Sequence, residues 1–276
     1  KTIFDLGLRY DFRQVTGGDG YQSKVFKSIS PKFSLYHNIN QNITGYLSYN
    51  EGFRAPSISE LFLEYESSYG LLLMGNPDLK SEFLTNLEMG LKNNNGSSFT
   101  VFGNIFINQY TDMIDFIYTI PVKSVNRESV KGLGFEFGSN IPLSKINANI
   151  NLTYSYLEME NINSEIPLLY RPKDKVRLTL SQKTPIVDVT ISTKYTSNQL
   201  YEDFLSDDHP IENNMVIFPL EQLPETIITS AIISKTISDY DISLKVNNLF
   251  DSRYVLIQYY PMPGRNFEIS LNKILK

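Results

Sequence analysis

Hydrophobic and polar residues alternate along several long stretches of the chain. Residues 3–13 begin the pattern, with apolar side chains at every second position and charged or small residues between them. The same alternation returns in 146–156, 175–181, 187–192 and 240–246. A period of two places the apolar side chains on one face of a β-strand and the polar ones on the other face. No helical stripe of useful length interrupts the pattern, so we predict an all-β fold.

The alternating stretches predict roughly twelve strands. Many of them run for about ten residues or more, whereas strands of globular proteins average about five or six. A tilted strand of about nine to eleven residues is long enough to cross a bilayer. The predicted strands are 2–13, 28–38, 41–51, 81–92, 97–118, 122–139, 143–158, 171–184, 186–201, 225–238, 240–250 and 264–275.

The connections between these strands alternate between short and long. The long ones fall at 14–27, 52–80, 158–170 and 202–224. Short turns on one rim and long loops on the other are typical of an outer-membrane barrel, in which a closed antiparallel sheet turns its apolar face to lipid. We therefore predict an antiparallel transmembrane β-barrel, with both chain ends on the short-turn, periplasmic side. A soluble β-sandwich or propeller, whose strands also alternate, is the alternative.

Composition narrows the functional classes. The chain has 276 residues, of which 41% are hydrophobic and 20% charged, and its formal net charge is −5. This acidic balance argues against a nucleic-acid surface, because phosphate binding needs a basic face. The absence of cysteine excludes a disulfide framework, a thiolate metal site and a cysteine nucleophile. No stretch of about 18 apolar residues predicts a transmembrane helix. The first residues resemble neither a signal peptide nor a translation start, so we expect a mature product or a fragment.

Short motifs interrupt the alternation in 53–62 (FRAPSISELF), 75–82 (GNPDLKSE), 132–138 (GLGFEFG), 247–254 (NNLFDSRY) and 263–267 (PGRNF). The prolines of the first two motifs cannot sit in central paired strands, so they predict irregular backbone beyond the membrane. The glycine near the last strand is expected to adopt a positive φ. We expect structural roles for these motif residues: Arg54, Pro56, Glu60, Asn76, Pro77, Glu82, Gly132, Asn248, Phe250, Tyr254, Gly264 and Arg265.

In order, spacing and wording, these motifs resemble the carboxyl-terminal half of the TonB-dependent outer-membrane receptors. The resemblance covers nearly the whole chain. It implies active, energy-coupled import of a scarce nutrient, with a plug domain inside a barrel of about twenty-two strands. We therefore expect 1–276 to be the C-terminal portion of the barrel domain. The plug, the first barrel strands and the TonB box would then lie outside this chain. A small self-closed barrel of about twelve strands is the alternative.

The resemblance also implies a location and partners. The location is the outer membrane of a Gram-negative bacterium. The partners are the outer-membrane lipid, the TonB energy-transducing complex acting through the N-terminal region, and a small-molecule or metal-chelate cargo. No nucleic acid and no resident cofactor are expected.

Two carboxylates are the sharpest candidates for a site. The alternation places Glu88 and Glu136 on the lumen face, among glycines and polar residues. Small neighbours allow another body to approach closely. In the receptor family, barrel glutamates on corresponding strands pair with plug arginines, so the resemblance implies that Glu88 and Glu136 contact the plug. A buried carboxylate needs such a cationic partner. The alternative is a solvated lumen carboxylate that contacts nothing.

The cargo is less defined by the sequence. The last outer loop, before Gly264, is short and looks like that of cobalamin-receptor-type members, so cobalamin is favoured over siderophore iron and haem. Four loop tyrosines are candidates for stacking on a flat cargo: Tyr65, Tyr69, Tyr201 and Tyr259. The loop around Asp207, Asp208 and His209 could hold a divalent cation through oxygen ligands, but its spacing matches no known ion loop, so a solvated polar loop is favoured and no metal site is expected.

The sequence leaves two other functions open, an outer-membrane enzyme and a passive porin. An outer-membrane lipase or protease would need a nucleophile with a base, and only His37 and His209 are available. We therefore expect no enzyme. A passive porin would use lumen charges such as Arg9, Asp11 and Lys245 to line an open pore.

Overall fold

The computed structural model describes residues 1–17, 23–68, 70–93, 99–117, 121–165, 167–206, 211–212, 215–216 and 218–273. Its main feature is one large sheet in which twelve long strands follow one another in chain order, each antiparallel to the next. These strands are β1 (Thr2–Val15), β2 (Lys24–Asn38), β3 (Ile43–Arg54), β6 (Glu82–Asn93), β7 (Thr100–Ile117), β8 (Val122–Leu143), β9 (Ala148–Asn161), β10 (Asp174–Lys183), β11 (Asp188–Thr196), β16 (Thr226–Ile237), β17 (Tyr240–Asn247) and β20 (Asn266–Lys273). Each overlaps one predicted strand, so the predicted all-β order is confirmed.

Short elements lie between the long strands, most of them in the longer connections, while η1 lies in the short turn between β8 and β9. They are α1 (Ile58–Phe62), β4 (Glu64–Ser67), β5 (Gly70–Met74), the 3₁₀ turn η1 (Ser144–Ile146), β12 (Gln199–Glu202), β13 (Ile211–Glu212), β14 (Met215–Val216), β15 (Leu220–Leu223), β18 (Val255–Ile257) and β19 (Tyr260–Pro261). The predicted strand 186–201 is divided, because β11 ends at Thr196 and β12 pairs with β15 outside the main sheet.

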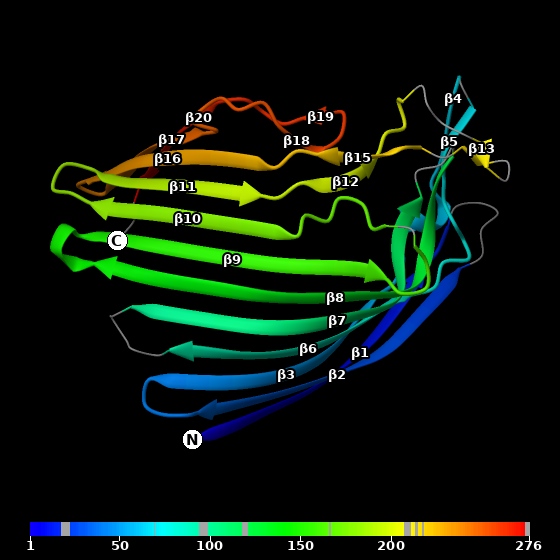
Figure 1. The fold of residues 1–276 in the computed structure, drawn as a ribbon, viewed down its shortest axis with the longest axis horizontal. Coiled ribbons are helices and arrows are strands. Elements are labelled where there is room, and N and C mark those ends of the chain that lie inside the picture. The colour runs from blue at the N-terminus through cyan, green and yellow to red at the C-terminus, as the bar shows by residue number, and fades with distance from the viewer. Residues whose placement is uncertain are drawn as a thin grey trace.

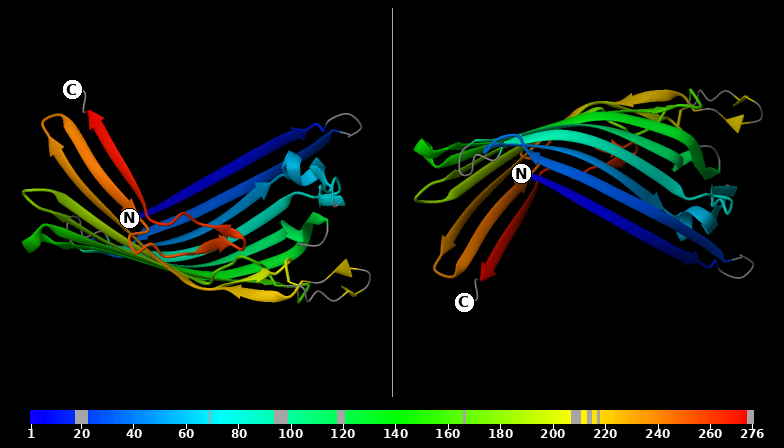
Figure 2. Two further views of the ribbon diagram at one scale, coloured as in Figure 1. Left: turned by 90° about the horizontal axis from the view of Figure 1, so that it is seen from above. Right: turned by 90° about the horizontal axis from the view of Figure 1, so that it is seen from below.

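The sheet is curved and open. In Figure 1 the short turns and both chain ends lie at one end of the strands, and the long connections lie at the other. Figure 2 shows the sheet as a trough whose two edges, β1 in blue and β20 in red, rise on the same side. Within the described ranges β1 pairs only with β2, and β20 only with β17. The described sheet is therefore open, as expected for about twelve strands out of about twenty-two, and the closure of a self-closed small barrel is not seen.

The two faces of the sheet differ as the alternation predicts. On the apolar face, large side chains such as Leu6 and Ile269 are 76% and 79% exposed. Apolar surface on this scale needs a covering medium or partner. The buried clusters are small and lie at the long-loop end; one joins Val15, Leu61, Leu79 and Ile114, and the other joins Met113, Val130 and Leu168.

None of the helices in the described part of the chain is long and apolar enough to span a bilayer.

Candidate functional site

The two predicted carboxylates lie on the polar face of the sheet, on β6 and β8, the two strands that flank β7. Glu88 of β6 pairs in register with Phe106 of β7, and Glu136 of β8 pairs with Asn104 of β7. Since neighbouring strands are about 4.8 Å apart and the two pairing positions differ by two residues along β7, the backbones of the two glutamates are separated by about 12 Å. Asn104, which lies between them, is the residue that sequence reasoning missed. The register of the alternating strands was the signal that could have found it.

Glu88 is fixed in position by two donors. Asn104 Nδ2 donates to Glu88 Oε1 at 2.7 Å, and the hydroxyl of Tyr46 on β3 donates to the same oxygen. Within the described ranges no hydrogen bond or ion pair involves the exposed Glu136 side chain. The Oδ1 atom of Asn104 is also buried without a donor. The group therefore offers a carboxylate held in place and a free carboxylate, an arrangement that suits a cation with several N–H groups.

The glycines beside this group do not leave the open space that the sequence suggested. A Cβ on Gly134 would lie 2.4 Å from the ring of Phe106, and a Cβ on Gly138 would lie 2.1 Å from the ring of Phe102. The ring of Tyr46 covers Gly90 in the same way, at 2.6 Å. The glycines are needed because aromatic rings from the neighbouring strand lie over them, so approach of another body is limited to the carboxylate positions.

The motif residues Arg54, Glu60 and Glu82 form an ion cluster at the long-loop end of the sheet. Arg54 Nη1 lies 2.9 Å from Glu60 Oε1, and Nη2 lies 3.1 Å from Glu82 Oε2. Glu82 Oε2 also accepts a hydrogen bond of 2.9 Å from the backbone N–H of Ile114 on β7. One guanidinium thus ties the end of β3 to α1 and β6.

Glu60 also belongs to the capping box that starts α1. The Glu60 N–H donates to Ser57 Oγ at 3.2 Å, and the Ser57 N–H donates to Glu60 Oε2 at 2.7 Å. Burial raises the pKa of the Glu60 carboxyl, but the hydrogen bonds from Ser57 and the Arg54 guanidinium outweigh it, so the pKa is lowered. The preceding Pro56 is fully buried.

The second motif wraps around this helix. The Asn76 N–H donates to the Glu60 carbonyl at 2.8 Å, and its side chain donates to the Ser124 carbonyl on β8 at 3.0 Å. A Cβ on Gly75 would lie 2.7 Å from the backbone of Leu61. The Pro77 carbonyl accepts a hydrogen bond from the Lys24 ammonium on β2. In this structure these residues fasten the long connection to the sheet.

The C-terminal motifs form a second folded corner. Asn248, at φ 50°, bonds the Ser252 backbone through both side-chain atoms, at 2.9 Å and 2.8 Å. Asp251 Oδ1 accepts from the Arg265 N–H at 2.7 Å. The predicted positive φ of Gly264 is wrong. Gly264 is required for another reason, because a Cβ there would lie 2.7 Å from Asp251 Oδ1.

The remaining motif residues have simpler surroundings. Gly132 is buried, and a Cβ there would lie 3.4 Å from Asn108 and Leu157. Phe250 is 70% exposed. The Tyr254 carbonyl accepts from the Met262 N–H at 3.0 Å.

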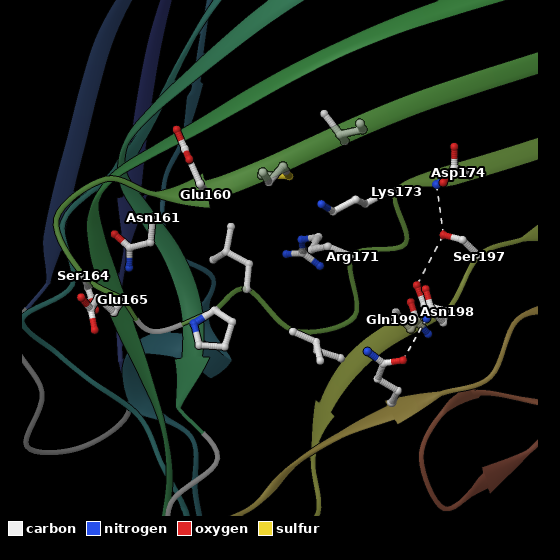
Figure 3. A pocket seen from close by; sticks show the side chains of 16 residues that line it. Glu160, Asn161, Ser164, Glu165, Arg171, Lys173, Asp174, Ser197, Asn198 and Gln199 are labelled. Carbon is white, nitrogen blue, oxygen red and sulfur yellow. Dashed lines mark hydrogen bonds between the residues drawn. The ribbon is translucent and has the colours of Figure 1, made fainter.

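A cavity of about 510 Å³ opens near the long-loop rim, between the end of β9, the connection before β10 and the start of β12. Figure 3 shows Arg171 and Lys173 side by side in it, with Glu160 and Glu165 toward the other end. The Asp174 N–H donates to Ser197 Oγ at 3.1 Å and joins β10 to the end of β11. No sequence pattern predicts this cavity, because the conformation of the loops creates it.

The predicted loop tyrosines are in different environments. Tyr65 is 53% exposed, whereas Tyr201 is buried. The Tyr259 hydroxyl donates to the Asp203 carboxylate, and the Tyr259 ring meets that of Phe204 edge-on with centroids 4.9 Å apart. Tyr69, Asp207, Asp208 and His209 lie outside the described residues. Over the described ranges, no group of three or more His, Cys, Asp or Glu side chains could hold a metal ion.

A separate ion pair lies beside this loop region. Arg127 of β8 and Asp115 of β7 are 3.1 Å apart, with the guanidinium side chain only 8% exposed. Burial raises the pKa of the nearby Glu202 carboxyl, Asp115 adds to the rise, and Arg127 opposes it.

Comparison with known proteins identifies relatives across the chain. The family model described as "TonB dependent receptor-like, beta-barrel" matches residues 1–249. The iron-regulated outer membrane virulence protein of Vibrio cholerae serotype O1 is 25% identical over 288 residues, covering 97% of this chain and 43% of that protein.

Solved structures share the fold. The copper transporter OprC aligns with a TM-score of 0.75 at 16% identity, covering 99% of this chain and 45% of its own. The siderophore receptor PirA from Acinetobacter baumannii aligns at 0.70 and 17% identity, covering 98% and 43%. The FrpB iron transporter from Neisseria meningitidis (F3-3 variant) aligns at 0.70 and 15%, covering 98% and 42%. The chain thus spans less than half the length of these relatives.

Proposed function

Because the chain belongs to the family of TonB-dependent receptors, matching their β-barrel, we propose that it forms the C-terminal part of the barrel of an outer-membrane importer. The match of the family model across residues 1–249 is the observation that carries this proposal. The family comprises receptors and transporters, so the lipase and protease alternatives fall away. The plug, the other strands and the TonB box would belong to the rest of the receptor.

The two faces of the sheet fit a barrel wall. The exposed apolar face would lie against outer-membrane lipid, and the polar face with Glu88 and Glu136 would line the lumen. The free edges of β1 and β20 would pair with the remaining strands, because unpaired strand edges are not tolerated in lipid. This requirement makes an independent twelve-strand porin the weaker candidate.

The carboxylate group gives the wall a role in gating. Glu88, held by Asn104 and Tyr46, and the unpaired Glu136 would receive arginine side chains of the plug. Pairing would remove the cost of enclosing two carboxylates when the plug fills the lumen. The plug would then stay seated until the TonB complex delivers energy.

We propose metal, carried as a chelate, as the cargo. The relatives described above are named for iron, copper and siderophores, and none of them is named for cobalamin. The short last loop, which suggested cobalamin, is closed here by the β18–β19 hairpin and by Tyr259 bound to Asp203. That packing explains the shortness of the loop without reference to cargo.

Growth under iron limitation tests this function. The full-length receptor would be expressed in a Gram-negative host that lacks its own ferric-chelate receptors, with TonB present or deleted. We expect a supplied ferric chelate to restore growth only when both receptor and TonB are present. Equal growth without TonB would contradict active transport, and failure of every supplied ferric chelate to restore growth would contradict the cargo.

A further inference from the structure

Three cations lie together on the polar face of β10 and β11. Arg177 and Lys194 are direct cross-strand partners, and Lys175 lies two residues from Arg177 on the same face. All three side chains are exposed, and within the described ranges none of them forms an ion pair or hydrogen bond with another side chain. We call these three residues the cation patch.

The cation patch differs from three other cations on this face, each of which has a carboxylate partner. Arg9 lies 2.7 Å from Asp11, Lys32 lies 3.0 Å from Asp5, and Lys245 lies 3.4 Å from Glu268. Like charges directly opposite each other on neighbouring strands destabilise a sheet, because their Cβ atoms are only about 5 Å apart. The Arg177–Lys194 pair therefore costs stability that an anion placed between the two side chains would recover.

The surroundings leave room for such an anion. The cation patch lines a cavity of about 360 Å³, together with the hydroxyl side chains of Thr153 and Ser155 on β9. Glu136 lines the far side of the same cavity. In the register Glu136 pairs with Ser155 and Ser155 pairs with Lys175, so two strand spacings, about 10 Å, separate this carboxylate from the lysine. Within the described ranges no ion pair joins Glu136 to a residue of the cation patch.

The 360 Å³ cavity, called the inner cavity, adjoins the 510 Å³ cavity at the long-loop end, called the rim cavity. Lys175 directly follows Asp174, which lines the rim cavity with Arg171 and Lys173 in Figure 3. On the next strand, Thr196 of the inner cavity directly precedes Ser197 of the rim cavity. The two cavities therefore adjoin, and Arg171 of the rim cavity adds a further cation, whereas Lys173 is paired with Glu158 at 2.5 Å.

We propose that Lys175, Arg177 and Lys194 form an anion-binding site that takes an oxygen-rich, negatively charged metal chelate as it passes from the rim cavity into the lumen. The inference rests on the proposed function and adds the sign of the cargo's charge. The arginine fork binds two oxygens at once, and the lysines contribute point charges beside it. A neutral chelate of the same size gains nothing from this site.

Uptake of paired chelates by the full-length receptor tests the site. The probes are radioiron bound in an anionic tris-catecholate and in a neutral tris-hydroxamate of similar size. We expect the triple variant K175Q/R177Q/K194Q to lower the initial uptake rate of the anionic chelate about tenfold and that of the neutral chelate less than about twofold. The charge-conserving variant K175R/R177K/K194R retains anionic uptake, which separates loss of charge from loss of folding. K245Q, which removes a cation already paired with Glu268, serves as the matched control.

Several results would overturn the proposal. Unchanged anionic uptake in the triple variant would remove the anion site and leave the importer intact. An equal fall for both chelates, with a leak current in the absence of cargo, would assign the cation patch to seating the plug. If the wild-type receptor imported no chelate at all, the proposed function itself would fail.

Discussion

Asn104 on β7 donates a 2.7 Å hydrogen bond from Nδ2 to Oε1 of Glu88 on β6, while its own Oδ1 is buried without a donor. One amide thus orients the first carboxylate and lies beside the second, Glu136, in the register. We regard this group as the seat for a cationic side chain of the plug.

Replacing Asn104 by leucine should loosen that seat. The variant loses one hydrogen bond to a charged group and one acceptor, a change of about 1–3 kcal/mol. We expect the plug of the solubilised full-length receptor to become sensitive to trypsin at a lower urea concentration. Asn247→Leu is the control, because Asn247 makes a similar bond, 2.9 Å to Asn266, far along the sheet. Identical urea thresholds for N104L and the wild type would refute the role of Asn104.

Gly138→Ala should destabilise the barrel wall. The added Cβ would lie 2.1 Å from the Phe102 ring, so the ring or the strand must move, at a cost of about 1–3 kcal/mol. Gly103→Ala is the control, since its nearest neighbour would be the Glu136 carbonyl at 3.7 Å. The measurement is the temperature at which the fast-migrating band of the folded full-length receptor disappears on a denaturing gel after heating in detergent. We expect this temperature to be highest for the wild type, slightly lower for G103A and lowest for G138A. Adding F102A to G138A should restore part of the loss. Equal transitions for the two glycine variants would be inconsistent with ring packing.

The capping box at α1 should give the loop a dependence on pH. Because folding lowers the Glu60 pKa below its ordinary value of 4.5, the stabilisation is present above that value and is lost as the pH falls below it. We expect faster deuterium exchange, corrected for intrinsic rates, in residues 55–64 at about pH 3.5 than at about pH 6. Glu60→Gln should lower the free energy of local opening of this loop by about 0.5–2 kcal/mol at neutral pH. The variant should also lose most of the dependence of exchange on pH. A pH effect of the same size in E60Q would assign it to another group.

Neutralising both lumen carboxylates should weaken the seating of the plug in the barrel. In E88Q/E136Q the plug loses two ion-pair partners, so we expect cells that carry the full-length variant to admit a bulky antibiotic normally excluded by the outer membrane. Glu268→Gln is the control, because Glu268 lies on the same face but already pairs with Lys245 at 3.4 Å. Antibiotic sensitivity that matches in all three proteins would argue against a gating role.

The sequence predicts the order of the long strands and the face on which each side chain lies, but it does not predict the contacts between strands and loops. Strict alternation determines which face each side chain takes, so the lumen positions of Glu88 and Glu136 follow once the strands are in register. The single turn of α1 is too short to show a helical period. The residues of its capping box, Ser57 and Glu60, lie within the 53–62 motif, which predicts only irregular backbone.

Other features depend on contacts that no local pattern encodes. The glycines looked like open space, yet Phe102 and Phe106 from β7 cover two of them. Gly264 resembled a residue with positive φ, but the constraint is its contact with Asp251. The rim cavity and the cargo depend on loop packing, which the alternation does not report.

Electrical conductance of the full-length receptor in a planar bilayer tests the central claim most directly, namely that the polar face of this sheet encloses a plug and not an open pore. The account predicts that the wild-type receptor carries no steady current, conducts when urea displaces the plug, and closes again when urea is removed. A steady current through the untreated wild-type receptor would contradict it.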